Sequence, residues 1–384
     1  MRDRPASPAA TPAVRRARAL RDRAARLHLA GRYRDADRAY AASARALRRA
    51  GPQATDELAA VLTARAEAQH ELGDHRNALE LATAACALVA HRRGGAARRL
   101  RARALGVLGN LHRTAGDYPR AARALHRALA LARVAGTPAR DAAIAMNNLG
   151  MLYKYTGQFA RAAAMYRASL AVTRRVCGAD HPDVASLYHN LGGLAYIRGR
   201  YRTAERWGRA GLELRARLLG ANHIVVAADA AALAASLDRL GRHAEAQRLY
   251  ARVLATFRRR YGDQHHEIAI TLNNLGASLY AEGKLSAAAL RYRAALEIQQ
   301  RLFGPAHVDV ALTANNLGIL YAKQHRYRLA LHHVGRARQI LIDRLGPRHP
   351  RARAVSDNWR ALCDLAGPAS PPTAAYLPHG RPRS

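Results

Sequence analysis

Residues 147–182 read NNLGMLYKYTGQFARAAAMYRASLAVTRRVCGADHP and contain nearly one full copy of the pattern that organises the chain. Apolar and small residues recur every three or four positions on both sides of Gly157, which is typical of two amphipathic helices joined by a turn. The stretch ends in Gly178-Ala-Asp-His181-Pro182. Glycine favours the left-handed residue that ends a helix, and proline is tolerated in the first turn of the next. This stretch therefore predicts one helix–turn–helix unit.

The same turn recurs along almost the whole chain at intervals of about 42 residues. Its glycine stands at Gly31, Gly73, Gly116, Gly157, Gly199, Gly241 and Gly283, and the next position in frame is His325. The linker between units keeps the same frame, with histidines at His181, His223, His265, His307 and His349. Because one helix pair cannot bury its apolar face alone, this periodicity predicts a stack of pairs.

The predicted fold class is all-α: a solenoid of about eight helix pairs, closed by a capping helix over residues 351–366. Apolar residues such as Ile144 and Leu149 fall at helical spacing and are expected on the buried faces. Small residues recur on the first helix of each pair, where they let the second helix approach closely; they are Gly109, Gly150, Gly192, Ala234, Gly276 and Gly318. We expect a single solenoid over residues 13–366, a disordered basic segment over 1–12 and a disordered proline-rich tail over 367–384.

These features resemble the tetratricopeptide repeat. The unit length, the Asn-Asn-Leu-Gly motif at 147–150 and the Gly-x-x-His-Pro linker resemble the kinesin-light-chain type of that repeat. The resemblance covers residues 13–366 and is strongest from the third repeat onward. It implies a right-handed superhelix in which the first helix of each pair lines a concave groove and the second faces outward. It also implies a binding scaffold, although the long heptad segment that couples such proteins to a motor is missing, so no transport role follows.

Asparagines recur on the predicted groove helices in the frame of the repeat. They are Asn148, Asn190, Asn274, Asn316 and Asn358, with Asn147, Asn273 and Asn315 as neighbours, while the sixth repeat has Ala232 instead. Because an amide both donates and accepts, a row of them can hold the backbone of an extended peptide. Tyr153, Tyr280 and Tyr321 would add apolar contacts to that peptide. The alternative is that these amides bond neighbouring helices or turns.

The chain is strongly basic, with 63 Lys and Arg against 27 Asp and Glu and a net charge of +36. Over the five best-defined repeats, the first helices sum to about −2 and the second helices to about +16. The positive charge is therefore predicted on the outer face, beside a nearly neutral groove. Such a surface favours acidic or polyanionic partners, or it simply keeps the chain in solution.

Arginine is densest at the N-terminal repeats. The candidate polyanion contacts are Arg15, Arg16, Arg18, Arg92, Arg93, Arg98, Arg99, Arg101 and Arg103. Phosphate binding needs such cations, but aromatic residues are not interleaved and no helix-turn-helix or zinc-finger motif is present. The second functional hypothesis, behind capture of a peptide or partner protein, is therefore a nucleic-acid-associated or regulatory role of the Arg-rich N-terminal repeats and the outer helix face, with non-specific nucleic-acid binding. Self-association is a third.

Catalytic and metal chemistry are not predicted. The linker histidines lie one repeat apart, which is not metal-ligand spacing and favours a role in the turns. No phosphate-binding loop, nucleophile elbow or carboxylate pair is visible, so we expect a non-enzymatic chain without cofactor or metal. Cys86, Cys177 and Cys363 lie far apart and cannot all pair, which favours a reducing compartment. With no secretory signal and no apolar run of about 18 residues, the expected location is the cytoplasm.

Overall fold

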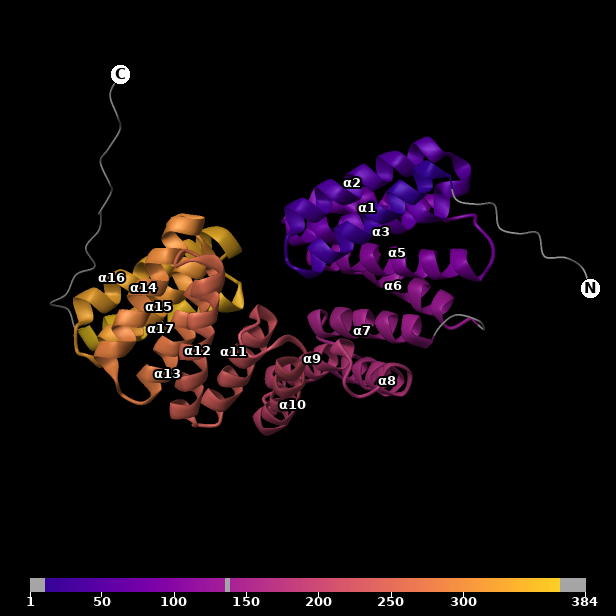
Figure 1. Ribbon diagram of the computed structural model, residues 1–384. Coiled ribbons are helices and arrows are strands. Elements are labelled where there is room, and N and C mark those ends of the chain that lie inside the picture. The colour runs from indigo at the N-terminus through magenta and orange to yellow at the C-terminus, as the bar shows by residue number, and fades with distance from the viewer. Residues whose placement is uncertain (1–10, 135–138, 367–384) are drawn as a thin grey trace, which may run out of the picture. The chain divides into compact units, whose positions relative to one another are not determined.

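The computed structural model describes residues 11–134 and 139–366, and Figure 1 shows them as a succession of antiparallel helix pairs. In these residues the secondary structure is helical throughout, with seventeen α-helices, one short 3-10 turn and no strand. The first helices of the pairs, called helices A, are α1 (Pro12–Leu29), α3 (Thr55–Glu71), α5 (Gly95–Thr114), α7 (Ala139–Tyr155), α9 (Pro182–Ile197), α11 (Ile224–Arg239), α13 (His266–Ala281) and α15 (Val308–Lys323). The second helices, called helices B, are α2 (Tyr33–Ala50), α4 (His75–Leu88), α6 (Tyr118–Ala132), α8 (Phe159–Cys177), α10 (Tyr201–Leu219), α12 (His243–Tyr261), α14 (Leu285–Phe303) and α16 (Tyr327–Leu345). The final helix is α17 (Pro350–Ala366), and η1 spans Pro52–Ala54. The predicted class, an α-solenoid of eight pairs and a C-terminal helix, is confirmed.

The turns inside the pairs share one closure. Each turn glycine has a positive φ, from 69° at Gly199 to 82° at Gly73. The next amide donates to the carbonyl five residues earlier, as from Gln158 N to Tyr153 O at 2.8 Å, which is the Schellman closure of a helix. His325 takes the same place with φ 58° and is the one non-glycine residue with positive φ in the described parts of the chain. The frame of the turns therefore follows the sequence even where glycine is replaced.

The linkers between pairs differ from the prediction in one respect. Gly178 has φ 87° and ψ 170°, so its backbone is extended with a positive φ and is not left-handed helical as expected. That region is open essentially to glycine alone. The linker histidine then caps the next helix: His265 Nδ1 accepts a hydrogen bond from Glu267 N at 3.2 Å. The same hydrogen bond, donated by the backbone amide two residues later, is accepted by Nδ1 of His181, His223, His307 and His349.

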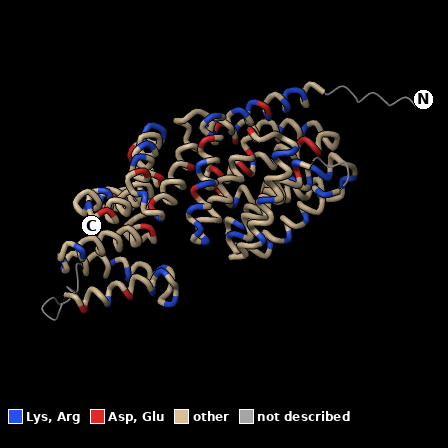
Figure 2. Tube along the Cα trace, turned by 90° about the horizontal axis from the view of Figure 1, so that it is seen from below, with Lys and Arg blue, Asp and Glu red and all other residues tan. Residues whose placement is uncertain are grey.

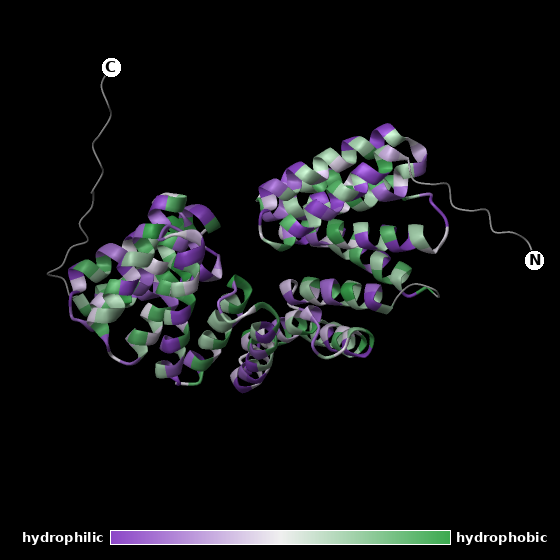
Figure 3. Cartoon of the chain, viewed as in Figure 1, coloured by the Kyte–Doolittle hydropathy of each residue, from purple (hydrophilic) through white to green (hydrophobic). Residues whose placement is uncertain are grey.

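Helices A and B of a pair pack closely because helix A lacks a side chain at the contact. A Cβ added to Gly150 would lie 2.6 Å from the ring of Tyr166, and one added to Gly276 would lie 2.8 Å from the ring of Tyr292. Both tyrosines are buried. Figure 3 shows hydrophobic and hydrophilic residues interspersed along the helices, as expected for helices with one buried face. The predicted role of the small residues is confirmed at these two positions.

The chain divides into two compact units, Met1–Leu194 and Ala195–Ser384, with the boundary inside α9. Within each unit consecutive helices A contact one another directly, for example α3 with α5 and α13 with α15. No comparable contact joins consecutive helices B in the described residues. Helices A therefore line the inner face of each unit, as the family resemblance implies. A single continuous solenoid over 13–366 stays a prediction.

The last helix differs from helices A at the position where helix B packs. Arg360 of α17 stands one repeat after Gly318, at the position where helix B packs in a complete pair, and it forms an ion pair with Asp357 at 2.5 Å. The opposite side of α17 buries Ala352, Val355 and Leu362. The predicted disordered segments are 1–12 and 367–384; α1 begins at Pro12, whereas residues 1–10 and 367–384 lie outside the described residues. No helix in the described parts is long and apolar enough to cross a membrane.

Candidate functional site

The recurring asparagines lie on helices A and bond to one another across repeats. Asn190 Nδ2 donates to Asn147 Oδ1 at 2.9 Å, and Asn316 Nδ2 donates to Asn273 Oδ1 at 3.1 Å. Asn358 donates to Asn315 in the same way at 3.1 Å. Each bond joins the asparagine at the second motif position of one repeat to the asparagine at the first motif position of the repeat before it, 43 residues earlier. The alternative role considered for these amides, bonding between neighbouring helices, is therefore present in the structure.

Two of the recurring asparagines have no amide side chain at the position of their hydrogen-bond partner. Because the turn glycines Gly116 and Gly157 are 41 residues apart, the position facing Asn148 is held by Gly106; the position facing Asn274 is held by Ala231, and neither residue has a side chain that can form a hydrogen bond. Asn148 is only 8% exposed, and its Nδ2 atom would lie 3.5 Å from a Cβ added to Gly106. The row of asparagines is therefore interrupted at Ala232, as predicted, and Asn274 in the next repeat has no amide partner in that motif.

A hollow of about 420 Å³ opens beside Asn148 on the inner face of the first unit. It is lined by α3, α5 and α7, three consecutive helices A. Gly106 stands one repeat before Asn147, so the missing side chain there makes room in the floor. Asn110, on the same wall, has a buried Oδ1 atom that accepts no hydrogen bond within the described residues. An unpaired buried acceptor costs roughly 1–3 kcal/mol, which makes this atom a candidate ligand contact.

The charges around this hollow are of both signs. Arg103 lies 3.5 Å from Glu67, and Arg140 on the opposite wall pairs with Asp183 at 3.0 Å. Asp141 also lines the hollow. Figure 2 shows the wider pattern, with basic residues on nearly every helix and acidic residues at fewer places. The inner-face hollow therefore combines local charge balance with polar amides, as expected for a nearly neutral groove.

The three predicted tyrosines lie on helices A but differ in accessibility. Tyr153 and Tyr321 are buried at 6% and 7% exposure, and the Tyr153 hydroxyl bonds His126 Nε2 at 3.1 Å. Tyr280 is half-buried beneath the ammonium of Lys323, 4.8 Å from the ring centre. Buried rings offer little surface to a peptide. At the hollow the exposed apolar side chain is Ile144, at 45% exposure; the prediction that it lies on a buried face is wrong.

The nine predicted polyanion-binding arginines do not lie on helices B. Those before residue 20 belong to α1, those from 98 to 103 belong to α5, and Arg92 and Arg93 precede α5. Three of them pair with acids of α3: Arg18 with Glu57 at 2.5 Å, Arg92 with Asp56 at 2.9 Å and Arg103 with Glu67 at 3.5 Å. Arg16 instead lines a hollow of about 410 Å³ with Arg45 and Arg49, between α1 and α2.

Two solved structures, with TM-scores above 0.5, have the same architecture as this chain. The apo form of RapI matches 80% of this chain over 81% of its own, with 15% identity and a TM-score of 0.60. The apo form of the quorum sensor NprR from B. thuringiensis matches 79% over 80% of its own, with 14% identity and a TM-score of 0.59. Nearly identical repeats of a putative kinesin light chain from Podosopora anserina match 55% over 99% of their own chain, with 18% identity and a TM-score of 0.47. No curated protein gave a significant match.

The repeats themselves match family models described as "Tetratricopeptide repeat". One model matches residues 141–217, 226–300 and 291–343, and a second matches residues 104–139. Together these matches span more than half of the chain and coincide with the helix pairs from α5 to α16. With its paired helices, turn glycines and inner row of helices A, the chain belongs to the tetratricopeptide repeat family.

Proposed function

We propose that this chain is a non-enzymatic scaffold that binds an extended segment of a partner protein on the inner face of its first unit. The observation that carries the proposal is the hollow between α3, α5 and α7, where Asn110 keeps a buried, unpaired acceptor. A peptide N–H would satisfy that oxygen, and Asn148 would offer a second amide nearby. The exposed side of Ile144 supplies apolar contact. Binding scaffolds of stacked repeats spread many small contacts over such a surface.

The paired asparagines support this function indirectly. The hydrogen bonds of Asn190, Asn316 and Asn358 each use one donor of an amide that has two. We propose that these pairs set the spacing between repeats, and thereby the shape of the inner face. The cytoplasm is the proposed location, consistent with the free thiols of Cys86, Cys177 and Cys363.

A peptide selection tests the proposal directly. Peptides are selected from a random displayed library against the full chain, and their affinities are measured by isothermal titration calorimetry. We expect the double variant Asn110→Ala, Asn148→Ala to bind the selected peptides at least about tenfold more weakly, because two hydrogen bonds are lost. Asn316→Ala, in the second unit, is the matched control and should change the affinity little. Equal binding by wild type and the double variant would refute the inner-face site.

Polyanion binding is a second candidate, favoured by the hollow between α1 and α2. Arg16, Arg45 and Arg49 line it, and no acidic side chain is among its described lining residues. If this surface binds polynucleotide, the affinity should fall steeply between about 50 and 200 mM salt as counterions are released. A flat salt response would remove this candidate. Self-association stays a prediction, to be tested by light scattering over a range of protein concentrations.

A further inference from the structure

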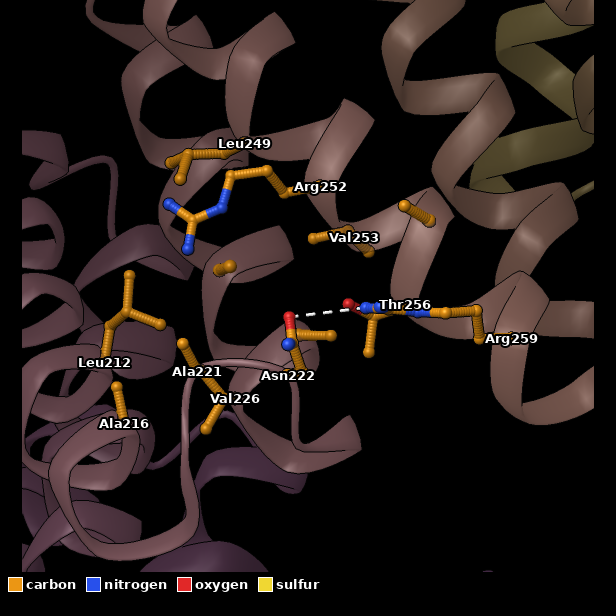
Figure 4. Close-up of a pocket in the computed structure, with 13 residues that line it drawn as sticks. Leu212, Ala216, Ala221, Asn222, Val226, Leu249, Arg252, Val253, Thr256 and Arg259 are labelled. Carbon is orange, nitrogen blue, oxygen red and sulfur yellow. Dashed lines mark hydrogen bonds between the residues drawn. The ribbon is translucent and has the colours of Figure 1, made fainter.

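A second kind of hollow lies in the second unit, away from the inner face. It has a volume of about 170 Å³ and is lined by α10, α11 and α12, so two of its three helices are helices B (Figure 4). Its walls are mostly apolar, with Leu212 on one side and Leu249 and Val253 on another. This outer hollow plays no part in the proposed peptide site, which belongs to the first unit.

The sequence explains why the hollow occurs at this repeat. Ala216 stands where the preceding and following repeats carry Arg174 and Arg258. Ala230, on the floor, stands where the next repeat carries Leu272. Ala255 is the third small residue of this kind, because the repeats before and after carry glutamate at its position. The hollow is therefore formed by small residues at positions that are filled elsewhere in the array.

The truncation at Ala255 also changes the charge of the rim. The corresponding residues one repeat earlier and later are Glu213 and Glu297. Arg252 and Arg259 both line the hollow, and no acidic side chain is among its described lining residues. The result is an apolar cavity with two cations at its mouth and no counter-charge of its own.

The two arginines stand on different sides of the cavity. Arg259 donates a hydrogen bond to Asn222 Oδ1 at 3.3 Å and closes one side. Figure 4 shows the guanidinium of Arg252 on the other side, near Leu249, with the open space between it and Asn222. Arg252 forms no ion pair within the described residues and is exposed, so its donors are available to an anion.

Size and charge together define the ligand. An apolar cavity of about 150 Å³ holds one benzene ring, so this hollow is large enough for a single aromatic ring or a leucine-sized group. Guanidinium groups bind carboxylates through paired, charge-assisted hydrogen bonds. We propose that the outer hollow binds a compact apolar group that carries a carboxylate. The chemistry is the same in a free aryl carboxylic acid and in the last residue of a peptide chain that ends in phenylalanine or leucine.

Two probes separate these sources: phenylacetate represents the free acid, and N-acetyl-phenylalanine represents the end of a peptide. Their binding to the full chain is measured by ligand-detected NMR and titration, with benzylamine as the probe of opposite charge. We expect both carboxylates to bind and benzylamine not to bind. Tighter binding of N-acetyl-phenylalanine identifies a peptide end as the ligand, and tighter binding of phenylacetate identifies a free acid. Absence of binding by both, or equal binding of benzylamine, overturns the proposal.

Matched variants on α12 test the two halves of the site. Arg252→Gln should weaken the carboxylates about tenfold or more by removing a charge-assisted hydrogen bond, whereas Arg248→Gln, with the same loss of charge on the same helix, should not. Ala255→Leu should fill the hollow and abolish binding, whereas Ala251→Leu, also exposed on α12 but outside the hollow, should not. If Arg252→Gln and Ala255→Leu bind the carboxylate probes as tightly as their control variants do, the proposed site is wrong. The inner-face variant Asn148→Ala should leave these probes unaffected, which separates this test from that of the peptide site.

Discussion

A hydrogen atom in place of a side chain allows a close contact between two helices at Gly150. Gly150 of α7 faces the ring of Tyr166, with no space for a methyl group between them. Gly193 of α9 lies in a helix as well, but nothing stands within 4 Å of the position where its Cβ would be. Two glycines in successive helices A therefore have different reasons to be glycine.

Replacing Gly150 by alanine should destabilise the chain by roughly 1–3 kcal/mol, because the added methyl group forces Tyr166 out of its position. Replacing Gly193 by alanine should be neutral, or stabilise by up to about 1 kcal/mol, through the better helix propensity of alanine. Thermal unfolding of both variants, followed by circular dichroism, measures the difference. Equal melting temperatures would contradict the tight contact.

At the scale of the element, five helices begin with the same cap. The acceptor is His Nδ1, so the imidazole must be neutral, with its proton on Nε2, for the bond to form. At His265 burial lowers the pKa, against the opposing effect of Glu267. Burial also lowers the pKa of His333 on α16, to about 4.

These lowered pKa values give the chain an acid-sensitive stability. Because the folded state disfavours the protonated imidazole, the unfolded chain takes up protons first as the pH falls below about 6.5. The contribution of these two histidines to the free energy of unfolding should be constant above that pH and decrease toward their folded-state pKa values, near pH 4 for His333. Melting temperatures at pH 7.5, 6 and 5 measure the effect. His265→Asp, which keeps a capping oxygen, should reduce the loss between pH 7.5 and 5, and an unchanged slope in this variant would exclude the cap as a cause.

A buried ion pair joins two further elements. Arg215 of α10 and Asp229 of α11 lie 2.7 Å apart, with side chains 13% and 5% exposed. Asp229→Ala should cost about 3–5 kcal/mol, because it leaves a buried guanidinium without its carboxylate. The double variant Arg215→Met, Asp229→Leu should recover most of that loss. Urea unfolding of the three proteins decides the point, and a mild effect of the single variant would show that Arg215 is solvated.

At the scale of the whole molecule, charge is the dominant property. A net charge of +36 opposes compactness, because like charges repel across the folded chain. Added sodium chloride screens this repulsion, so the melting temperature should rise between about 50 and 500 mM salt. Glucose at matched osmolality controls for effects other than screening. A melting temperature that falls with salt would show that the attractive ion pairs outweigh the net repulsion.

The sequence predicts the succession of helices well because each boundary depends on a local requirement. The turns need a positive φ, and the linkers need a residue that ends one helix and caps the next, so glycine and histidine mark both. Contacts between repeats are less predictable. The asparagine pairs cross from one motif to its neighbour with a 43-residue separation, which the 42-residue frame conceals. Ile144 and Tyr153 both lie on α7, yet Ile144 is 45% exposed and Tyr153 only 6%, because Tyr153 is covered by residues of a neighbouring helix such as His126.

The arginine at the end of the array restricts how the gene can change in length. A ninth pair added after α17 would place Arg360 against a new helix B, where the earlier pairs have glycine or alanine, and would bury its charge. A copy of α13 and α14 inserted before α15 meets no such obstacle, since it would present the same glycine, the same asparagines and the same histidine cap to both neighbours. Proteins of this lineage should therefore vary in repeat number by duplication inside the array, with the terminal helix carried along unchanged.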